Sequence, residues 1–127
     1  MRIVVTGKEG QIASAVAAVG AEIGLDVRRI GRPDLDLTNP STIFPAIASA
    51  RPDAIISAAA YTAVDKAEIE PELAYAINSA GAGAVAAAAD RLGVPVLHLS
   101  TDYVFDGSKP AAYVETDETA PISVYGA

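Results

Sequence analysis

Short apolar runs alternate with longer stretches of helical periodicity along this chain of 127 residues. Each apolar run has the length of a strand that is buried in a sheet. The predicted strands occupy residues 3–5, 26–31, 53–58 and 94–99, and the first, third and fourth of them are apolar runs. Helical patterns lie between them, over residues 12–23, from Pro40 onward, and over residues 71–92. Such alternation predicts an α/β fold, with about four strands in a parallel sheet and helices on both faces.

Composition limits the class of protein and the class of partner. The length predicts a single domain over residues 1–127. A net charge of −7, without any cluster of Lys or Arg, argues against nucleic acid or an anionic membrane as partner. Cysteine is absent, and no His/carboxylate cluster has ligand spacing, so we expect no disulfide and no metal site. Without a signal peptide or a long apolar run, the protein is expected to be cytoplasmic.

A glycine loop joins the first apolar run to the first helical pattern. Gly7, Gly10 and Ala13 have the spacing G-x-x-G-x-x-A. A strand, a glycine loop and a helix together form the context of a dinucleotide-binding fingerprint, which places a pyrophosphate at the helix N-terminus. An ordinary turn is the alternative, because glycine is common there as well. The fingerprint predicts a Rossmann-like, NAD(P)-binding domain. The apolar residues that predict the buried face of this helix are Ile12, Val16, Val19 and Ile23.

Further candidates for cofactor binding follow the second and third predicted strands, since ligands of open α/β sheets lie outside the carboxyl ends of strands. Arg32 stands where an acidic residue would select NAD or an arginine would accept the extra phosphate of NADP. NADP is therefore favoured, NAD stays open, and a solvated arginine is the alternative. The third predicted strand leads into Ala58, Ala59 and Ala60, whose small side chains would let a cofactor lie against the backbone. Tyr61 either stacks on a ligand or packs internally.

Polar and aromatic side chains follow the fourth predicted strand. Residues 94–99 are predicted to form a buried strand, in which His98 is either a core residue or a residue that supports the site, rather than a catalytic base. Hydroxyl, carboxylate and aromatic side chains come directly after it, at Thr101, Asp102 and Phe105 among others. An irregular segment over residues 108–120 then carries the chain to Tyr125.

Two polar features inside helical patterns have open interpretations. Residues 64–68 are predicted to be helical, and they are either a solvated surface or a face toward a substrate. Asn78 lies within the helical pattern over residues 71–92, as an ordinary polar residue or as a bridge to the site.

Three separated segments together resemble the dTDP-4-dehydrorhamnose reductase family of extended short-chain dehydrogenases/reductases. They are residues 7–12 (GKEGQI), 58–68 (AAAYTAVDKAE) and 99–107 (LSTDYVFDG). The second and third segments are more discriminating than the first. The resemblance implies an NADPH-dependent reduction of the 4-keto group of dTDP-4-dehydrorhamnose to dTDP-L-rhamnose, a step of nucleotide-sugar and polysaccharide biosynthesis.

The resemblance also implies roles for individual residues. Thr101 and Tyr125 would be catalytic: Tyr125 protonates the keto oxygen, and Thr101 donates a hydrogen bond to it. Asp102 and Phe105 would lie close to the sugar. The residues implied in cofactor binding are Gly7, Gly10, Gln11 and Ile12, then Asp36 and Leu37 near the adenine, and Ala58, Ala59, Ala60 and Tyr61.

Two departures from the family pattern affect these expectations. The third glycine position is Ala13, which is a tolerable change. The Tyr-x-x-x-Lys pair of the family needs a lysine four residues after Tyr125, beyond residue 127. The resemblance covers the whole chain but less than half of the family's usual length, without the substrate domain. We therefore expect these 127 residues alone to bind cofactor weakly, if at all, and to catalyse no turnover.

Alternative functions stay open at this stage. A non-catalytic regulatory or binding subunit of the same family would keep the fold without turnover. A sibling nucleotide-sugar epimerase or dehydratase is a further alternative, although the residues over positions 102–107 weigh against it. A homodimer of the full-length protein is also left open.

Overall fold

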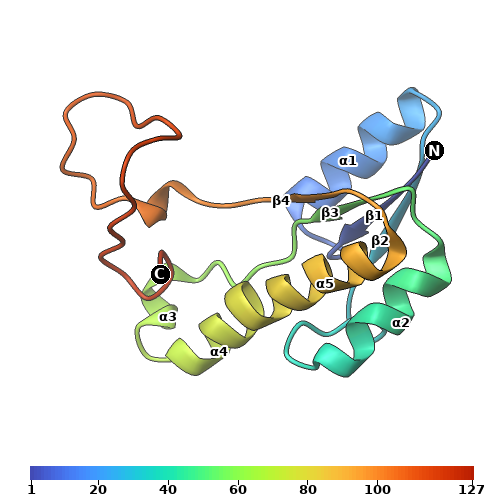
Figure 1. The fold of residues 1–127 in the computed structure, drawn as a ribbon, viewed down its shortest axis with the longest axis horizontal. Coiled ribbons are helices and arrows are strands. Elements are labelled where there is room, and N and C mark those ends of the chain that lie inside the picture. The colour runs from blue at the N-terminus through green and yellow to red at the C-terminus, as the bar shows by residue number, and fades with distance from the viewer.

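Four parallel strands form one sheet in the computed structural model, which describes all residues from 1 to 127 (Figure 1). The strands are β1 (Arg2–Thr6), β2 (Asp26–Ile30), β3 (Ala54–Ser57) and β4 (Val96–His98). Their order is β2-β1-β3-β4, and every neighbouring pair is parallel. All four carboxyl ends therefore lie at one end of the sheet. This arrangement confirms the predicted α/β, Rossmann-like architecture.

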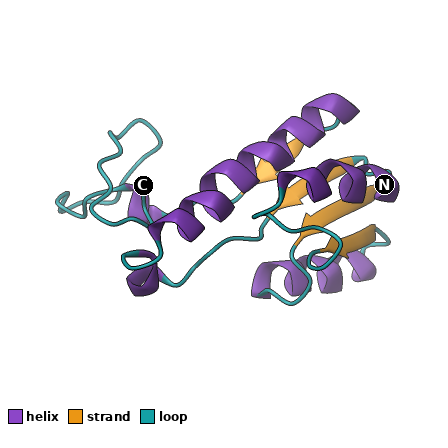
Figure 2. Ribbon diagram, turned by 90° about the horizontal axis from the view of Figure 1, so that it is seen from below, coloured by secondary structure: helices purple, strands orange, loops and turns teal.

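Helices cover both faces of the sheet (Figures 1 and 2). Helix α1 (Gln11–Glu22) packs against β1 and β2, while α2 (Pro40–Ala50) and α5 (Ala82–Leu92) pack against each other on the opposite face. The core lies between this second pair of helices and the sheet. Ile43 and Ile47 of α2, Ile55 of β3 and Val85 of α5 are fully buried there. Burial of each such side chain contributes roughly 1.5–3 kcal/mol to folding.

Helix α1 buries a different face from the one that its apolar residues predict. Ile12, Val19 and Ile23 are exposed, the last by 67%. The buried residues of the helix are Ala13 and Gly20 instead. These small residues let the helix approach the sheet closely, and Gly20 leaves no room for a side chain beside Val27. The predicted face was wrong because close contact, not hydrophobicity, selects the buried side of this helix.

The helical prediction over residues 71–92 is confirmed, although the helix changes type on the way. It runs through α4 (Pro71–Tyr75), a π-helical segment η1 (Ala76–Gly81) and α5. A π-helical turn inside an α-helix is frequent at functional sites. Residues 64–68 also contain the predicted helix, α3 (Val64–Ala67).

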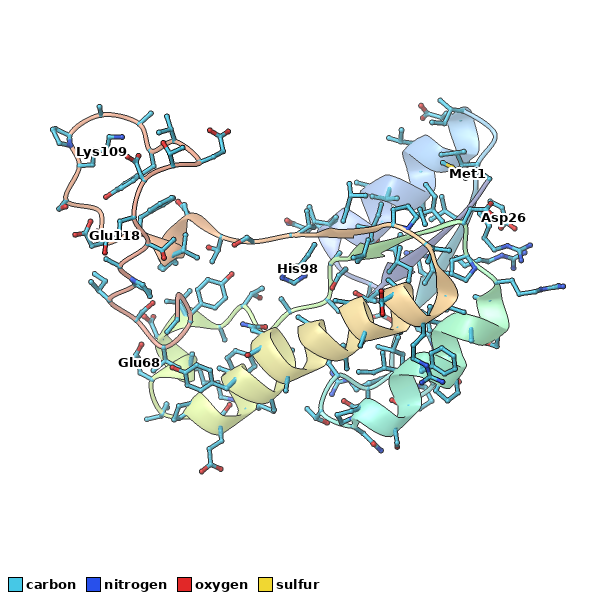
Figure 3. The ribbon with its side chains drawn as sticks, viewed as in Figure 1. Met1, Asp26, Glu68, His98, Lys109 and Glu118 are labelled. Atoms are coloured by element: carbon cyan, nitrogen blue, oxygen red, sulfur yellow. The ribbon has the colours of Figure 1, made fainter.

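Strand β4 is shorter and more exposed than residues 94–99 predict. Leu97 is 59% exposed and Leu99 is 44% exposed. His98 is exposed as well and lies at the free edge of the sheet, which excludes the core role among the two predicted for it (Figure 3). The reason is position: β4 pairs only with β3.

After β4 the chain leaves the sheet. It is irregular from there on, apart from one short 3-10 helix, η2 (Asp102–Val104). Figure 1 shows this C-terminal segment, residues 100–127, extending away from the strands before it returns beside α3. None of the helices combines the length and the apolar character needed to cross a bilayer.

Candidate cofactor and catalytic site

Three predicted cofactor-binding segments meet at the carboxyl end of the sheet. The glycine loop, residues 7–10, follows β1, Arg32 follows β2, and the β3 loop, residues 58–61, follows β3. A Cβ placed on Gly7 would lie 3.7 Å from Cβ of Ala59. The Gly7 N–H donates to the Ile30 carbonyl over 2.7 Å, at the end of β2. Segments far apart in sequence thus form one continuous surface.

The glycine loop has the geometry that a dinucleotide fingerprint requires. Gly7 has a φ of 101°, in the left-handed region that other residues avoid. Gly10 is the N-cap of α1, and a Cβ on it would meet nothing within 4 Å. Gln11 and Ile12 begin the helix and are exposed. Backbone N–H groups at such a helix start favour an anion, because the helix dipole adds to their hydrogen-bonding capacity.

Charged residues surround the loop that follows β2. Lys8 and Asp34 form an ion pair of 2.9 Å, which connects the glycine loop to this second loop. Asp36 accepts hydrogen bonds from the hydroxyl and the N–H of Thr38, at 2.8 and 2.9 Å. These bonds, with a smaller contribution from the charge of Arg32, lower the pKa of Asp36. Arg32 itself is exposed beside this carboxylate.

Leu37 and Asp36, the two residues implied to lie near the adenine, differ in exposure. Its side chain is 8% exposed and packs within the core cluster of α2 and α5. Only the backbone of Leu37 is therefore available to a cofactor at this position, whereas Asp36 is half-buried.

Thr6 holds the first half of the β3 loop, and sequence reasoning missed it. Its hydroxyl oxygen accepts hydrogen bonds from the N–H groups of both Ala58 and Ala59, each at 3.0 Å. Thr6 is fully buried at the end of β1, so these bonds are shielded from water. A hydroxyl-bearing residue that closes an apolar run was the only signal for this role in the sequence.

Asn78 holds the second half of the β3 loop. Its side-chain oxygen accepts from the Tyr61 N–H at 2.8 Å, and its side-chain N–H donates to the Tyr61 carbonyl at 2.9 Å. Asn78 belongs to the π-helical segment η1. Asn78 is therefore not an ordinary solvated polar residue, because it bridges η1 to the β3 loop.

The side chain of Tyr61 belongs to a polar network beneath the loop. Its hydroxyl donates to Glu70 over 2.9 Å, and Glu70 pairs with Lys66 at 3.0 Å. Desolvation, followed by the hydrogen bond to Glu70, raises the pKa of Tyr61. The Lys66 hydrogen bond, followed by that of Tyr61, lowers the pKa of Glu70. Tyr61 thus stays protonated, with its hydroxyl bound inside the protein.

The two predicted catalytic residues lie in the C-terminal segment. The Thr101 hydroxyl accepts from the Tyr103 N–H at 3.2 Å and so caps η2, whose first residue is Asp102. The rings of Tyr103 and Tyr125 meet edge to face, with centroids 5.4 Å apart. Tyr125 therefore lies beside Tyr103, which is two residues after Thr101 in the sequence. Gly126 follows it against the Tyr103 carbonyl, where a Cβ would collide.

The ring of Phe105, which is predicted to lie near a sugar, packs against another ring of this protein. Its ring stacks on Tyr113 with centroids 4.1 Å apart and an interplanar angle of 9°. Asp106 accepts from the Tyr113 hydroxyl at 3.0 Å, which holds that ring in place.

Of two surface hollows, one runs along β2 and α2, and the other lies at the opposite end of the sheet from the glycine loop. The larger, of about 530 Å³, is lined by Met1, Arg2, Gly24, Asp26, Arg51 and Asp53. These residues stand at or before the amino ends of the strands, opposite the glycine loop. The size of a hollow therefore does not locate the predicted site.

Comparisons with known proteins agree with this geometry. A dTDP-4-dehydrorhamnose reductase of Sinorhizobium fredii (strain NBRC 101917 / NGR234) is 58% identical over 126 residues, and the match covers 99% of this chain and 42% of that protein. The crystal structure of a dTDP-4-dehydrorhamnose reductase from Clostridium acetobutylicum superposes with a TM-score of 0.94 at 38% identity, covering 99% of this chain and 45% of that one.

A second solved structure carries a bound cofactor. It is the dTDP-4-dehydrorhamnose reductase of Bacillus anthracis in complex with NADP, with a TM-score of 0.92 and 40% identity. The match covers 98% of this chain and 44% of that one. The chain thus spans less than half the length of the relatives that it matches. A family model described as "RmlD substrate binding domain" matches residues 1–127. The chain belongs to this family.

Proposed function

We propose that this chain is the cofactor-binding portion of an NADPH-dependent reductase that converts dTDP-4-dehydrorhamnose to dTDP-L-rhamnose. The observation that carries the proposal is the meeting of the glycine loop, Arg32 and the β3 loop at the carboxyl end of the sheet. Relatives that cover the whole chain have this activity in their names, which supports the proposal.

The residues present fit a dinucleotide. The start of α1 at Gln11 and Ile12 would hold the pyrophosphate, and the open space beside Gly10 would let it approach the backbone. Asp36 and the backbone of Leu37 would lie near the adenine. Arg32 would bind the phosphate that distinguishes NADP from NAD, which favours NADP while NAD stays open.

The β3 loop would form the opposite wall of the cofactor site. Ala58, Ala59 and Ala60 have small side chains, so their backbone is accessible to a flat ring system. Thr6 and Asn78 hold this backbone from two sides, and Tyr61 is tied to the network below it. A wall fixed before binding reduces the ordering that binding would otherwise require.

The hydroxyl groups of Tyr125 and Thr101 would have separate roles in the reduction. NADPH, when held by the glycine loop and the β3 loop, would supply the hydride for the 4-keto carbon. Tyr125 donates its hydroxyl proton to the keto oxygen, and Thr101 donates a hydrogen bond to the same oxygen. Asp102 follows Thr101 directly in the sequence and would contact the sugar, whereas Phe105, whose ring stacks on Tyr113, could contact it only with the outer face or edge of that ring. The substrate is thus a nucleotide sugar. A homodimer and a cytoplasmic location stay predictions from the sequence.

Cofactor titration tests this proposal directly. NADPH and NADH would be titrated into the chain and into an Arg32→Ala variant, with fluorescence or calorimetry as the readout. Loss of a charge-assisted contact should weaken NADPH binding roughly tenfold and leave NADH binding unchanged. Arg28→Ala is the matched control, because Arg28 pairs with Asp26 near the other end of β2. Equal weakening of both cofactors would contradict the assignment of Arg32, and no binding of either by the longer protein that carries this chain would contradict the proposed function.

A further inference from the structure

A single hydrogen bond joins the C-terminal segment to the rest of the protein. The last bond of the sheet edge runs from the Leu99 N–H to the Ser57 carbonyl. The hydrogen bonds and ion pairs of residues 100–127 join residues within this segment, and one bond alone leaves it. The Val124 N–H donates to Oε1 of Glu68 over 2.8 Å. Figure 3 shows Glu68 below the end of this segment, next to α3.

This bond acts directly beside the predicted proton donor. Val124 precedes Tyr125, whose ring rests against Tyr103. Gly126 follows, and its N–H donates to the hydroxyl of Ser123 at 3.2 Å. The backbone on the amino side of Tyr125 is thus held by Glu68, and the backbone on its carboxyl side is held within the segment. Without Glu68, only the packing of the segment would determine where Tyr125 lies.

The element that carries Glu68 also supports the cofactor site. Glu68 follows α3, and Glu70 lies two residues further on. Glu70 binds the Tyr61 hydroxyl and Lys66, while Glu68 binds Val124. One short stretch, residues 66–70, therefore contacts both the β3 loop and the segment that contains Tyr125. Neither open interpretation of residues 64–68, a solvated surface or a substrate-facing helix, describes this connection.

We propose that Glu68 is a positioning residue for Tyr125. Its carboxylate accepts the Val124 N–H and holds Tyr125 against Tyr103, near Thr101 and in a constant relation to the β3 loop. Glu68 itself does not touch the reacting atoms. The positional claim stands on the geometry alone, and its consequence for the reaction rests on the proposed function of Tyr125.

Amide hydrogen exchange tests the positional claim. In the intact chain, Glu68→Ala should speed exchange of the Val124 N–H roughly fivefold, as expected for loss of an exposed charge-assisted bond. It should also weaken the nuclear Overhauser contacts between the rings of Tyr103 and Tyr125. Glu68→Gln removes the charge but keeps an acceptor oxygen, so it should retain most of the protection. Glu72→Ala is the matched control, since Glu72 is exposed on α4 and its side chain forms no hydrogen bond or ion pair. Unchanged exchange in Glu68→Ala would overturn the proposal.

The reductase assay then separates positioning from cofactor binding. In the protein that carries this chain, Glu68→Ala should lower kcat several-fold, leave KM for NADPH unchanged, and be largely rescued in Glu68→Gln. An unchanged kcat despite faster Val124 exchange would overturn the positioning role. Faster exchange in a protein that binds no NADPH would leave the positional claim intact and contradict the proposed function instead.

Discussion

At the scale of single residues, the most consequential side chains are buried or paired polar ones. Thr6 accepts two N–H groups of the β3 loop, and Asn78 binds both backbone groups of Tyr61. Each therefore satisfies backbone atoms that would otherwise have no partner, and an unsatisfied buried N–H costs about 1–3 kcal/mol. The wall of the proposed cofactor site depends on these two residues more than on the alanines that form it.

Replacement of Thr6 by valine tests this dependence. Thr6→Val keeps the branched shape but removes the acceptor, so the N–H groups of Ala58 and Ala59 lose their partner. We expect the free energy of unfolding to fall by about 2 kcal/mol, as measured by urea denaturation. The control is Thr62→Val, at an exposed residue in the following turn. Equal stabilities for Thr6→Val and the unmodified chain would contradict the account.

At the scale of elements, the stretch from α3 to α4 connects the β3 loop to the C-terminal segment, the two regions that hold the proposed site. Glu70 pairs with Lys66 and with the Tyr61 hydroxyl, whereas Glu68 reaches Val124. The π-helical segment η1 then places Asn78 toward the same loop. These short elements bury little apolar surface, so polar contacts rather than a hydrophobic core determine their arrangement.

The pH dependence of stability should report on Glu70. Its partners lower its pKa below the ordinary value of 4.5. A carboxyl with a lowered folded-state pKa stabilises fully above the unfolded-state value, and that contribution disappears as pH falls toward the folded-state pKa. The unmodified chain should therefore lose more stability than Glu70→Gln as pH falls below about 4.5. Urea denaturation from pH 6 to pH 3 measures this difference. Parallel curves for the two proteins would show that the pairing of Glu70 adds nothing to folding.

At the scale of the whole molecule, the sheet is complete enough to build the cofactor surface but has a free edge at β4. Leu97 and Leu99 are exposed along this edge, and so is the apolar face of α1 that includes Ile23. The chain spans only 42% of the Sinorhizobium fredii relative. The family's lysine partner of Tyr125 falls outside residues 1–127.

These features predict weak cofactor binding and no turnover by the 127 residues alone. A tyrosine in water has a pKa of about 10, so proton transfer near neutrality needs a shift of about 3 units from neighbouring charge. The lysine implied by the family resemblance would supply part of that shift. The measurement is steady-state oxidation of NADPH by the purified chain with dTDP-4-dehydrorhamnose. Sustained oxidation would contradict this prediction.

The sequence by itself determined the elements and the segments of the proposed site, because these depend on neighbours along the chain. Strand-length apolar runs, the glycine loop at Gly7 and the helical pattern over residues 71–92 are local features, and each has its counterpart in the structure. The resemblance in three segments pointed to the same family as the comparisons.

Only the tertiary structure decided which side chains hold the site together, because their partners are distant in sequence. Thr6 reaches Ala58 across 52 positions, and Glu68 reaches Val124 across 56. Periodicity carries no information about such pairs. It also could not reveal that α1 buries Gly20 in place of Ile23, since burial depends on how closely the neighbouring sheet approaches. The exposure of His98 has a similar cause, because a strand is buried only where other elements cover it.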